Sequence, residues 1–317
     1  MEYNINFPAL FNTMGKIAII DMGTNTFHLL IAEKEGGVTR IIHRDYEPVK
    51  IGMGGINEGV ISDAARQRAV SAMMRFSDTL RQQQVSAVHA FGTSALRNAK
   101  NGRALAEEIN SITGIAIRII SGEEEADLIY SGVKAALDLG KDTNLVMDIG
   151  AGSVEFIIGD ASQLSWKQSF EIGGQRLLER FQKHDPITPL EIKALDDYFE
   201  EMLQPLFATL KKFTPTVLVG SSGTFDTLSD IFIIRNRIHR TFEQAETPLT
   251  KEAFYEIYGE LVRKNRAERL QIPGMSAIRV DMIVVACCLI RFILGKHPFN
   301  RIRVSTYSLK EGVLAKL

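Results

Sequence analysis

The sequence IDMGTNTFHLLI at residues 20–31 returns in altered form as MDIGAGSVEFII at residues 147–158. In each copy an apolar segment ends in an aspartate, Asp21 or Asp148, and the chain turns through glycine and small polar residues into a second apolar segment. The offset between the aspartates is 148 − 21 = 127. This pattern predicts two equivalent β-hairpins whose tight turns present backbone N–H groups and hydroxyls.

A second pair of small-residue loops repeats at nearly the same offset. GTSA at residues 92–95 follows the strand-like segment 85–90, and GSSGT at residues 220–224 follows the segment 217–219, so that 220 − 92 = 128. A loop of this kind between a strand and a helix directs backbone N–H groups at an anion. The candidate phosphate-binding residues of the four loops are Gly23, Thr24, Asn25, Thr26, Thr93, Ser94, Gly150, Gly152, Ser153, Gly220, Ser221, Ser222, Gly223 and Thr224.

Two offsets that agree within one residue indicate a duplicated α/β lobe with two phosphate-type loops in each copy. Hydrophobic periodicity around the loops agrees with this interpretation. It predicts further strands at 115–120 and 163–170 and a helix over 122–138 that links the lobes. Longer helices are expected at 188–211, 250–264 and 277–294. Because no Ser- or Pro-rich linker separates the copies, we expect the lobes to pack across a cleft.

Composition excludes several classes of protein. The 317 residues include 37 Lys and Arg against 38 Asp and Glu, and this net charge of −1 excludes a globally basic nucleic-acid-binding protein. The adjacent Cys287 and Cys288 exclude a disulfide scaffold. The apolar run from Met282 meets Arg291 too early to span a bilayer, which needs about 20 residues. With no cationic leader segment, the sequence predicts a cytoplasmic protein without membrane or nucleic-acid partners.

Eight segments spread over nearly the whole chain resemble the exopolyphosphatase/guanosine pentaphosphate phosphohydrolase family, within the actin, sugar-kinase and heat-shock-chaperone superfamily. They are residues 21–30, 92–98, 121–133, 148–156, 173–181, 220–224, 279–281 and 309–314. The resemblance implies the short two-domain form, with two actin-like (ribonuclease H-like) lobes around an interdomain cleft. It predicts a first lobe of residues 1–124 plus about 306–317 and a second lobe of residues 125–305.

Carboxylates beside the hairpin turns are the candidate metal ligands. Asp148 and Glu155 lie seven residues apart on opposite arms of the second hairpin, and Asp21 is the equivalent of Asp148 in the first. Glu155 stands in an otherwise apolar segment, where a charge is costly unless it is paired or bound to metal. Carboxylates next to a phosphate loop suit Mg²⁺ or Mn²⁺, which prefer oxygen ligands. These three residues are therefore the predicted metal site.

The segment SGEEE at residues 121–125 has a structural and a catalytic interpretation. Ser121 and Glu124 match a helix capping box, and acidic residues favour a helix N-terminus. Glu125 is not needed by the box, and the resemblance implies that it is the general base. Amides at the helix start would keep Glu125 ionised. The resemblance also implies that Arg97 faces the phosphate, a role that suits guanidinium geometry.

Several positions depart from the family's pattern. Ala151 stands in place of a glycine, Val154 in place of a threonine, and Asp127 where an arginine is common. Ser308 and Lys310 replace a glycine and an arginine near the C-terminus. These departures leave the predicted acid/base and metal residues intact, and they put the substrate affinity in doubt.

The resemblance and the loops together predict an exopolyphosphatase that removes the terminal phosphate of inorganic polyphosphate with Mg²⁺. Guanosine pentaphosphate 5′-phosphohydrolase and a non-catalytic phosphate or nucleotide sensor remain alternatives, whereas the Glu125 motif argues against a small-molecule kinase. The expected partner is polyphosphate or a phosphorylated guanosine nucleotide. Formation of a homodimer is a further alternative. Candidate cationic contacts for a polyanion are Arg97, Lys100, Arg103, Arg176 and Arg180.

Overall fold

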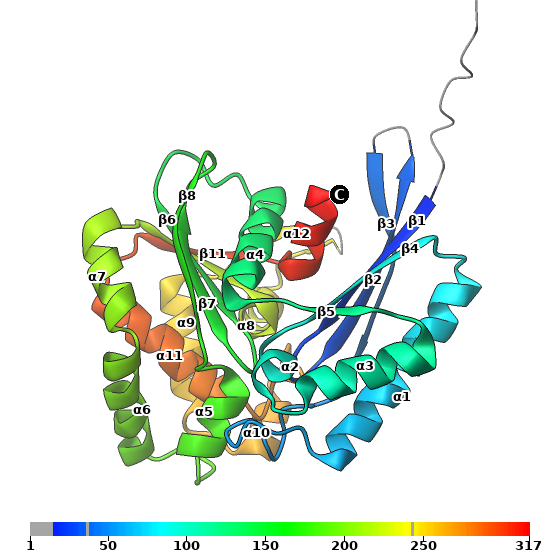
Figure 1. Cartoon of the computed structure of the whole chain (residues 1–317). Coiled ribbons are helices and arrows are strands. Elements are labelled where there is room, and N and C mark those ends of the chain that lie inside the picture. Colours follow the sequence, from blue (N-terminus) through cyan, green and yellow to red (C-terminus); the bar gives the residue numbers. More distant parts are fainter. Residues whose placement is uncertain (1–14, 36–37, 242–243) are drawn as a thin grey trace, which may run out of the picture.

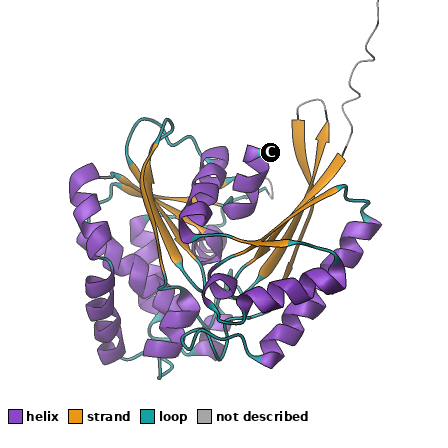
Figure 2. Cartoon of the chain, viewed as in Figure 1, coloured by secondary structure: helices purple, strands orange, loops and turns teal. Residues whose placement is uncertain are grey.

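The computed structural model describes residues 15–35, 38–241 and 244–317. Two β-sheets stand apart, each with helices packed against it, and a pair of helices lies between them (Figures 1 and 2). The first 14 residues of the predicted first lobe lie outside the described residues. No helix in the described ranges is long and apolar enough to cross a membrane.

The first sheet has the strand order β3-β2-β1-β4-β5 and the second has the order β10-β11-β9-β6-β7-β8. The strands of the first sheet are β1 (Gly15–Met22), β2 (Phe27–Glu35), β3 (Val38–Glu47), β4 (Ala87–Gly92) and β5 (Ile117–Ile119). Those of the second are β6 (Asn144–Ile149), β7 (Val154–Gly159), β8 (Leu164–Phe170), β9 (Val217–Ser221), β10 (Glu246–Thr247) and β11 (Arg301–Ser305).

The helices of the first half of the chain are α1 (Asp63–Gln82), α2 (Ser94–Asn98), α3 (Gly102–Thr113) and α4 (Gly122–Ala136). The second half adds α5 (Gly174–Phe181), α6 (Pro189–Met202), α7 (Gln204–Phe213), α8 (Ser222–Arg235), α9 (Lys251–Leu261), α10 (Arg266–Leu270), α11 (Ile283–Lys296) and α12 (Leu309–Lys316).

The sheet topology confirms the duplication. In each copy the first strand pairs antiparallel with the second and parallel with a later one, β1 with β2 and β4, and β6 with β7 and β9. The third strand of each hairpin unit, β3 or β8, then pairs antiparallel with the second. Because both copies share this connectivity, equivalent loops fall at equivalent edges of the two sheets. The expected α/β class with two actin-like lobes is confirmed.

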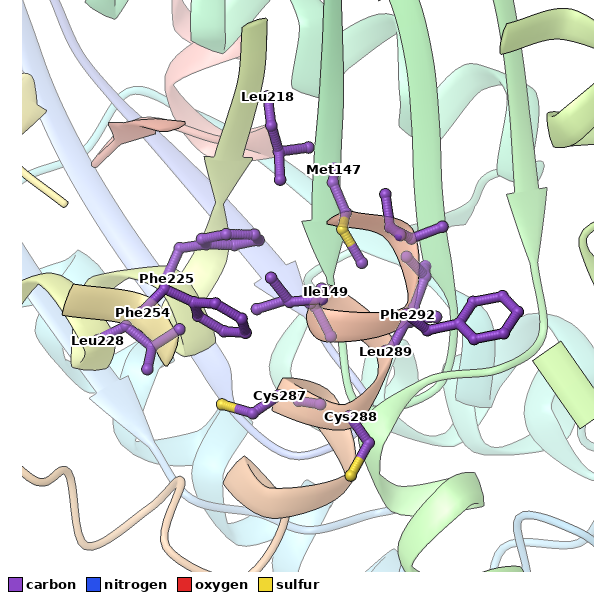
Figure 3. Packing of buried hydrophobic residues seen from close by; sticks show 14 of the residues in the cluster. Met147, Ile149, Leu218, Phe225, Leu228, Phe254, Cys287, Cys288, Leu289 and Phe292 are labelled. Carbon is purple, nitrogen blue, oxygen red and sulfur yellow. The ribbon is translucent and has the colours of Figure 1, made fainter. Parts of the chain in front are cut away.

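The second lobe contains the larger core, because β6 and β7 are buried along their whole length. Met147 and Ile149 of β6 point into a cluster that α8, α9 and α11 complete (Figure 3). Cys287 and Cys288 of α11 are buried free thiols within this cluster. Their position confirms that the apolar run forms core helix.

Two predicted helices differ from the structure. The helix expected over residues 188–211 is divided into α6 and α7 at Leu203. Pro205 stands in the first turn of α7, and a proline cannot donate the backbone hydrogen bond that a continuous helix requires. The helix expected from residue 277 begins at Ile283, so that Arg279 belongs to the preceding turn.

Helices α4 and α12 cross between the two sheets at a pair of glycines. A Cβ atom on Gly312 would overlap the carbonyl group of Leu128, and one on Gly132 would overlap the carbonyl group of Ser308. Glu311 of α12 also accepts a hydrogen bond from Arg44 of β3 at 2.8 Å. The C-terminal helix therefore contacts both α4 and the first sheet, and two glycines allow the close approach.

Replacing Gly312 by alanine should lower the free energy of unfolding by about 1–3 kcal/mol, because the added methyl group would force two helix backbones apart. Gly295→Ala is the matched control, since Gly295 lies in α11 with nothing within 4 Å of the added Cβ atom. That variant should be neutral or stabilised by up to about 1 kcal/mol. Urea unfolding of the two variants compares these values, and equal effects would contradict the close-contact explanation.

Candidate active site

A cavity of about 80 Å³ lies where the turns of the two predicted hairpins meet. Both lobes contribute to its wall, together with the start of α4 and the loop before α12. The sequence-predicted residues that line it are Asp21, Gly23, Thr24, Asn25, Thr26, Thr93, Ser94, Glu125, Asp148, Gly150, Gly152, Ser153, Glu155 and Ser222. The structure therefore brings together residues that are far apart in the sequence.

Five predicted site residues lie outside the cavity wall. Gly220 and Thr224 are buried around the β9–α8 junction, where Gly220 packs against a phenylalanine ring. Ser221 reaches the site indirectly, by donating a hydrogen bond to Asp148 at 2.7 Å. Gly223 packs against the Arg279 guanidinium. Arg97, predicted to face the phosphate, lies beside Glu125, whose carboxylate accepts a hydrogen bond from Arg97 Nη1 at 2.8 Å.

The hairpin register explains which side chains face the cavity. Asp148 lies directly opposite Glu155 in the β6–β7 ladder, and Asp21 lies opposite His28 in the β1–β2 ladder. Opposed residues of an antiparallel pair project from the same face of the sheet. His28 therefore lines the cavity as well. The repeat could have revealed this, because adding the offset of 127 to position 28 gives position 155.

Three hydroxyl groups hold the Asp148 carboxylate. Ser221, Ser222 and Ser308 each donate to it at 2.7–2.8 Å. Ser222 adopts a φ of 70°, in the left-handed region that non-glycine residues rarely occupy. Its hydroxyl reaches both carboxylate oxygens from this conformation. Ser308, one of the departures from the family's pattern, thus contacts a predicted metal ligand, which the sequence alone did not show.

Two buried hydroxyl groups of the first hairpin turn have no hydrogen-bond partner among the described residues. They are Thr24 Oγ1 and Thr26 Oγ1, and both residues line the cavity. Across from them, a Cβ atom on Gly152 would overlap the hydroxyls of Thr24 and Ser94. Because unpaired buried polar groups are costly, these hydroxyls indicate a site for a hydrogen-bonding ligand.

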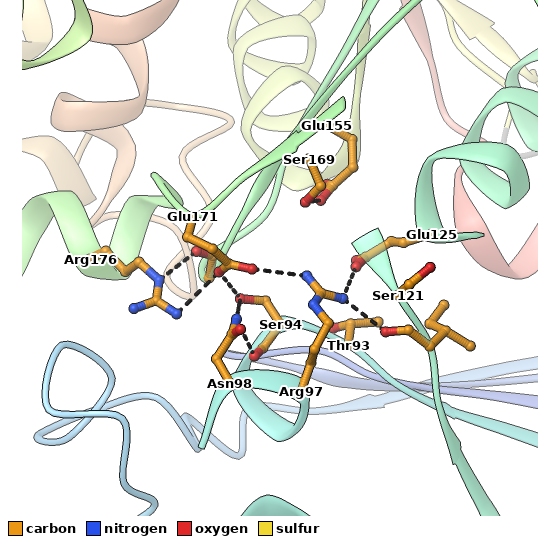
Figure 4. Close-up of polar contacts among 12 residues, drawn as sticks. Thr93, Ser94, Arg97, Asn98, Ser121, Glu125, Glu155, Ser169, Glu171 and Arg176 are labelled. Carbon is orange, nitrogen blue, oxygen red and sulfur yellow. Dashed lines mark hydrogen bonds and ion pairs between the residues drawn. The ribbon is translucent and has the colours of Figure 1, made fainter. Parts of the chain in front are cut away.

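Glu125 lies at the first turn of α4, where the expected cap is half formed. Ser121 Oγ accepts from the Glu124 backbone N–H at 3.1 Å, but the Glu124 side chain pairs with Arg118 instead of closing the box. Glu125 points the other way, into the cavity and toward Arg97 (Figure 4). The two neighbouring glutamates therefore have different surroundings, one facing outward and one buried.

Three carboxyl groups of the cavity, those of Asp21, Glu125 and Glu155, have raised pKa values. Burial raises the pKa of Glu125 to about 8, although the charge of Arg97 opposes the rise. This corrects the expectation that helix-start amides keep Glu125 ionised at neutral pH. Burial also raises the pKa of Asp21 to about 6, against the charge of Lys310. For Glu155, burial and then the charge of Glu125 raise the pKa well above its ordinary value.

Positive charge reaches this cavity mainly from Arg279. Its guanidinium lines the cavity, and it makes no hydrogen bond or ion pair with any described residue. In the sequence, Arg279 is marked only as part of the matching segment 279–281. Lys310, another departure, lies close enough to lower the pKa of both Asp21 and His28. The structure thus supplies cations at positions that the motifs alone did not identify.

The donor set fits a hard divalent cation held by few protein ligands. Among the described residues, no three His, Cys, Asp or Glu side chains group into a metal-binding cluster, so the three predicted carboxylates do not converge as one ligand set. Asp148 and Glu155, opposed across one ladder, are the pair that fits. Mg²⁺ is commonly bound by one or two carboxylates together with substrate phosphates and water.

The remaining departures fit the structure without strain. Ala151 is buried and its φ is not in the left-handed region, so no glycine is required there. Val154 is buried in β7. Asp127 of α4 forms an ion pair with Lys167 of β8, which accounts for an acidic residue at that position.

Duplicated actin-like lobes whose phosphate-type loops face one cavity define an enzyme class that handles phosphoryl groups. The profile of the Ppx/GppA phosphatase family matches residues 30–317. The chain belongs to this family, and it is a hydrolase that acts on phosphoric anhydrides.

Solved structures agree with this assignment. An exopolyphosphatase from Cytophaga hutchinsonii is 44% identical, with a TM-score of 0.92 over 94% of this chain and 96% of that one. An exopolyphosphatase-like protein is 25% identical, with a TM-score of 0.85 over 95% of this chain and 97% of that one. A Ppx/GppA family member from Aquifex aeolicus, 23% identical, shares the fold with a TM-score of 0.78 over 96% and 97% of the two chains.

The raised pKa values predict how the stability of the metal-free protein depends on pH. Asp21, Glu125 and Glu155 have folded-state pKa values above their unfolded values, so they stabilise the fold fully below about pH 4. This contribution is lost as the pH rises through about 6 to 8. The melting temperature of the Glu125→Gln variant should therefore fall less between pH 6 and pH 8 than that of the wild type. Parallel curves for the two proteins would contradict the assigned shift.

Proposed function

We propose that this protein is an exopolyphosphatase that hydrolyses the terminal phosphate of inorganic polyphosphate with Mg²⁺ or Mn²⁺. The observation that carries the proposal is the pair of buried hydroxyls of Thr24 and Thr26, which have no partner among the described residues and belong to residues that line the cavity. The 44% identical Cytophaga protein, described as an exopolyphosphatase, supports the same substrate class.

The cavity can hold one phosphoryl group. Its volume of about 80 Å³ is several times the roughly 10–15 Å³ that one water needs by the same kind of measure. The turns at residues 23–26 and 150–153 would enclose the terminal phosphate from both lobes. Arg279, which has no partner among the described residues, would offset its charge. The small volume suits one phosphoryl group, as an enzyme that acts on the terminal phosphate requires.

Glu125 is the candidate general base. Its carboxyl group is buried at the cavity wall, and it would accept the proton of a water that attacks the terminal phosphorus. Arg97 holds one carboxylate oxygen at 2.8 Å and so fixes the orientation of the side chain. A divalent cation bound by Asp148 and Glu155 would supply positive charge that lowers the Glu125 pKa and stabilises the phosphoryl group. Positioning and charge account for most catalysis in phosphoryl transfer.

Phosphate release should be seen with long polyphosphate in the presence of Mg²⁺ and should disappear in EDTA, because the buried carboxylates need a compensating cation. Guanosine pentaphosphate, which presents a similar terminal phosphate, and ATP are assayed in parallel to compare kcat/KM. Undiminished turnover in EDTA would exclude the metal role. Preference for guanosine pentaphosphate would replace the proposed substrate, and binding without turnover of any substrate would favour the sensor alternative.

Glu125→Gln should reduce kcat by roughly 10²–10⁴, the usual contribution of a positioned general base, with little change in substrate binding. Glutamine keeps the size of the side chain and an oxygen that can accept from Arg97. The matched control is Glu124→Gln, one residue earlier, where the side chain faces Arg118 outside the cavity.

The control variant should lose little activity, because the substitution removes only an exposed ion pair. Such a pair contributes about 0–1 kcal/mol to the stability of the fold. Melting temperatures of both variants separate loss of chemistry from loss of fold. Full activity of Glu125→Gln, or equal losses in the two variants, would reject Glu125 as the base.

A further inference from the structure

Glu171, in the loop between β8 and α5, accepts hydrogen bonds from three side chains at or beside the proposed phosphate site. Its carboxylate accepts from Ser94 Oγ at 2.6 Å, from Arg97 Nη2 at 3.1 Å and from Arg176 Nη2 at 3.1 Å (Figure 4). Ser94 and Arg97 come from the first lobe, whereas Glu171 and Arg176 come from the second. One carboxylate therefore satisfies donors from both sides of the cavity.

These donors adjoin the cavity itself. Ser94 lines it, and the Ser94 hydroxyl lies close against the backbone of Gly152 in the second hairpin turn. Arg176 donates to the Gly152 carbonyl at 2.8 Å, so its guanidinium is anchored to the same turn. Arg97 extends from Glu125 to Glu171. Ser94, Arg97 and Arg176, the donors to Glu171, are here called the Glu171 cluster. One of them lines the cavity, and the other two contact residues of its wall.

The cluster has the chemistry of an oxyanion site. Two guanidinium groups and a hydroxyl are the donors that commonly bind a phosphate, and a carboxylate offers a similar set of acceptor oxygens. The exposed fraction is 37% for the Glu171 side chain and only 16% and 14% for the two arginines. Glu171 can therefore leave into solvent, while the arginines remain in place as a positively charged pair.

We propose that the Glu171 cluster is a second anion subsite, which binds the phosphate next to the terminal one, and that Glu171 occupies it as an internal competitor. Entry of a chain with at least two linked phosphates would displace the Glu171 carboxylate from Ser94, Arg97 and Arg176. Glu171 would thereby weaken binding of diphosphate groups relative to orthophosphate. This inference rests on the proposed function, since it assumes that the terminal phosphate lies in the cavity.

Glu179 of α5 provides a matched comparison in the same lobe. Its carboxylate also bridges to the first lobe, where it accepts from the Gly54 backbone N–H at 3.0 Å and from Asn57 at 3.2 Å. It contacts neither arginine of the cluster. Replacing Glu179 therefore removes a carboxylate from the contact between the lobes without releasing any donor of the proposed subsite.

The test compares the binding of imidodiphosphate, whose P–N–P bridge resists hydrolysis, with that of orthophosphate by calorimetry. Glu171→Gln should bind imidodiphosphate about tenfold more tightly than the wild type, with a change of at most about twofold for orthophosphate, because a neutral amide competes weakly for arginine. Glu179→Gln should match the wild type with both ligands. Unchanged or weaker imidodiphosphate binding by a folded Glu171→Gln protein would overturn the proposal.

A crystal structure of the wild-type protein with imidodiphosphate covers the case in which Glu171→Gln does not fold. Arg97 Nη2 should then contact a phosphate oxygen in place of Glu171, and an intact contact between Arg97 and Glu171 would reject the subsite. Binding is measured without turnover, so the two proposals can fail separately. Tighter binding by Glu171→Gln in a protein that hydrolyses no polyphosphate would overturn the proposed function alone, and turnover without tighter binding would overturn the subsite alone.

Discussion

The concentration of acidic groups in one small buried cavity is the constraint on which the rest of the site depends. Asp21, Glu125, Asp148 and Glu155 all line a space of about 80 Å³ that is also the proposed site of a phosphoryl group. Charges cannot be buried together in this way without compensation. Part of this compensation comes from three serine hydroxyls that donate hydrogen bonds to Asp148. Burial also raises the pKa of Glu125, which favours its neutral form. The proposed cation and the nearby guanidinium groups complete the balance.

This constraint also explains why the site lies between lobes. A single sheet edge offers one hairpin turn, whereas two duplicated sheets place a turn on each side of the cavity. The backbone approach is close enough that Gly152 touches side chains of the first lobe. The crossing of α4 and α12 holds the lobes in register, since Gly132 and Gly312 let the two helices meet at their backbones. The proposed site and the contact between α4 and α12 therefore both depend on how the two lobes are placed relative to each other.

The two hairpins of the duplicated lobes carry different side chains at equivalent positions. His28 and Glu155 occupy the same register position in the two hairpins, each opposite an aspartate. Burial and the nearby cations Lys310 and Arg279 lower the pKa of His28, so the first hairpin adds no positive charge there. The second hairpin carries the carboxylate pair that suits a metal. In the proposed mechanism, the first half of the cavity would offer hydroxyl contacts to the phosphate and the second half would hold the cation.

The sequence by itself determined the duplication, the α/β class, the family and the loops that line the cavity, because these depend on local patterns that repeat at a fixed offset. It also identified Asp148 and Glu155 as a facing pair, since the hairpin register is set by a short turn. Only the tertiary structure decided the contacts of Arg97, Glu171 and Ser308. Those partners come from segments far apart in the chain, and their distances depend on how the two lobes pack. The ionisation of the buried carboxyl groups was also beyond the sequence, because desolvation is a property of the assembled cavity.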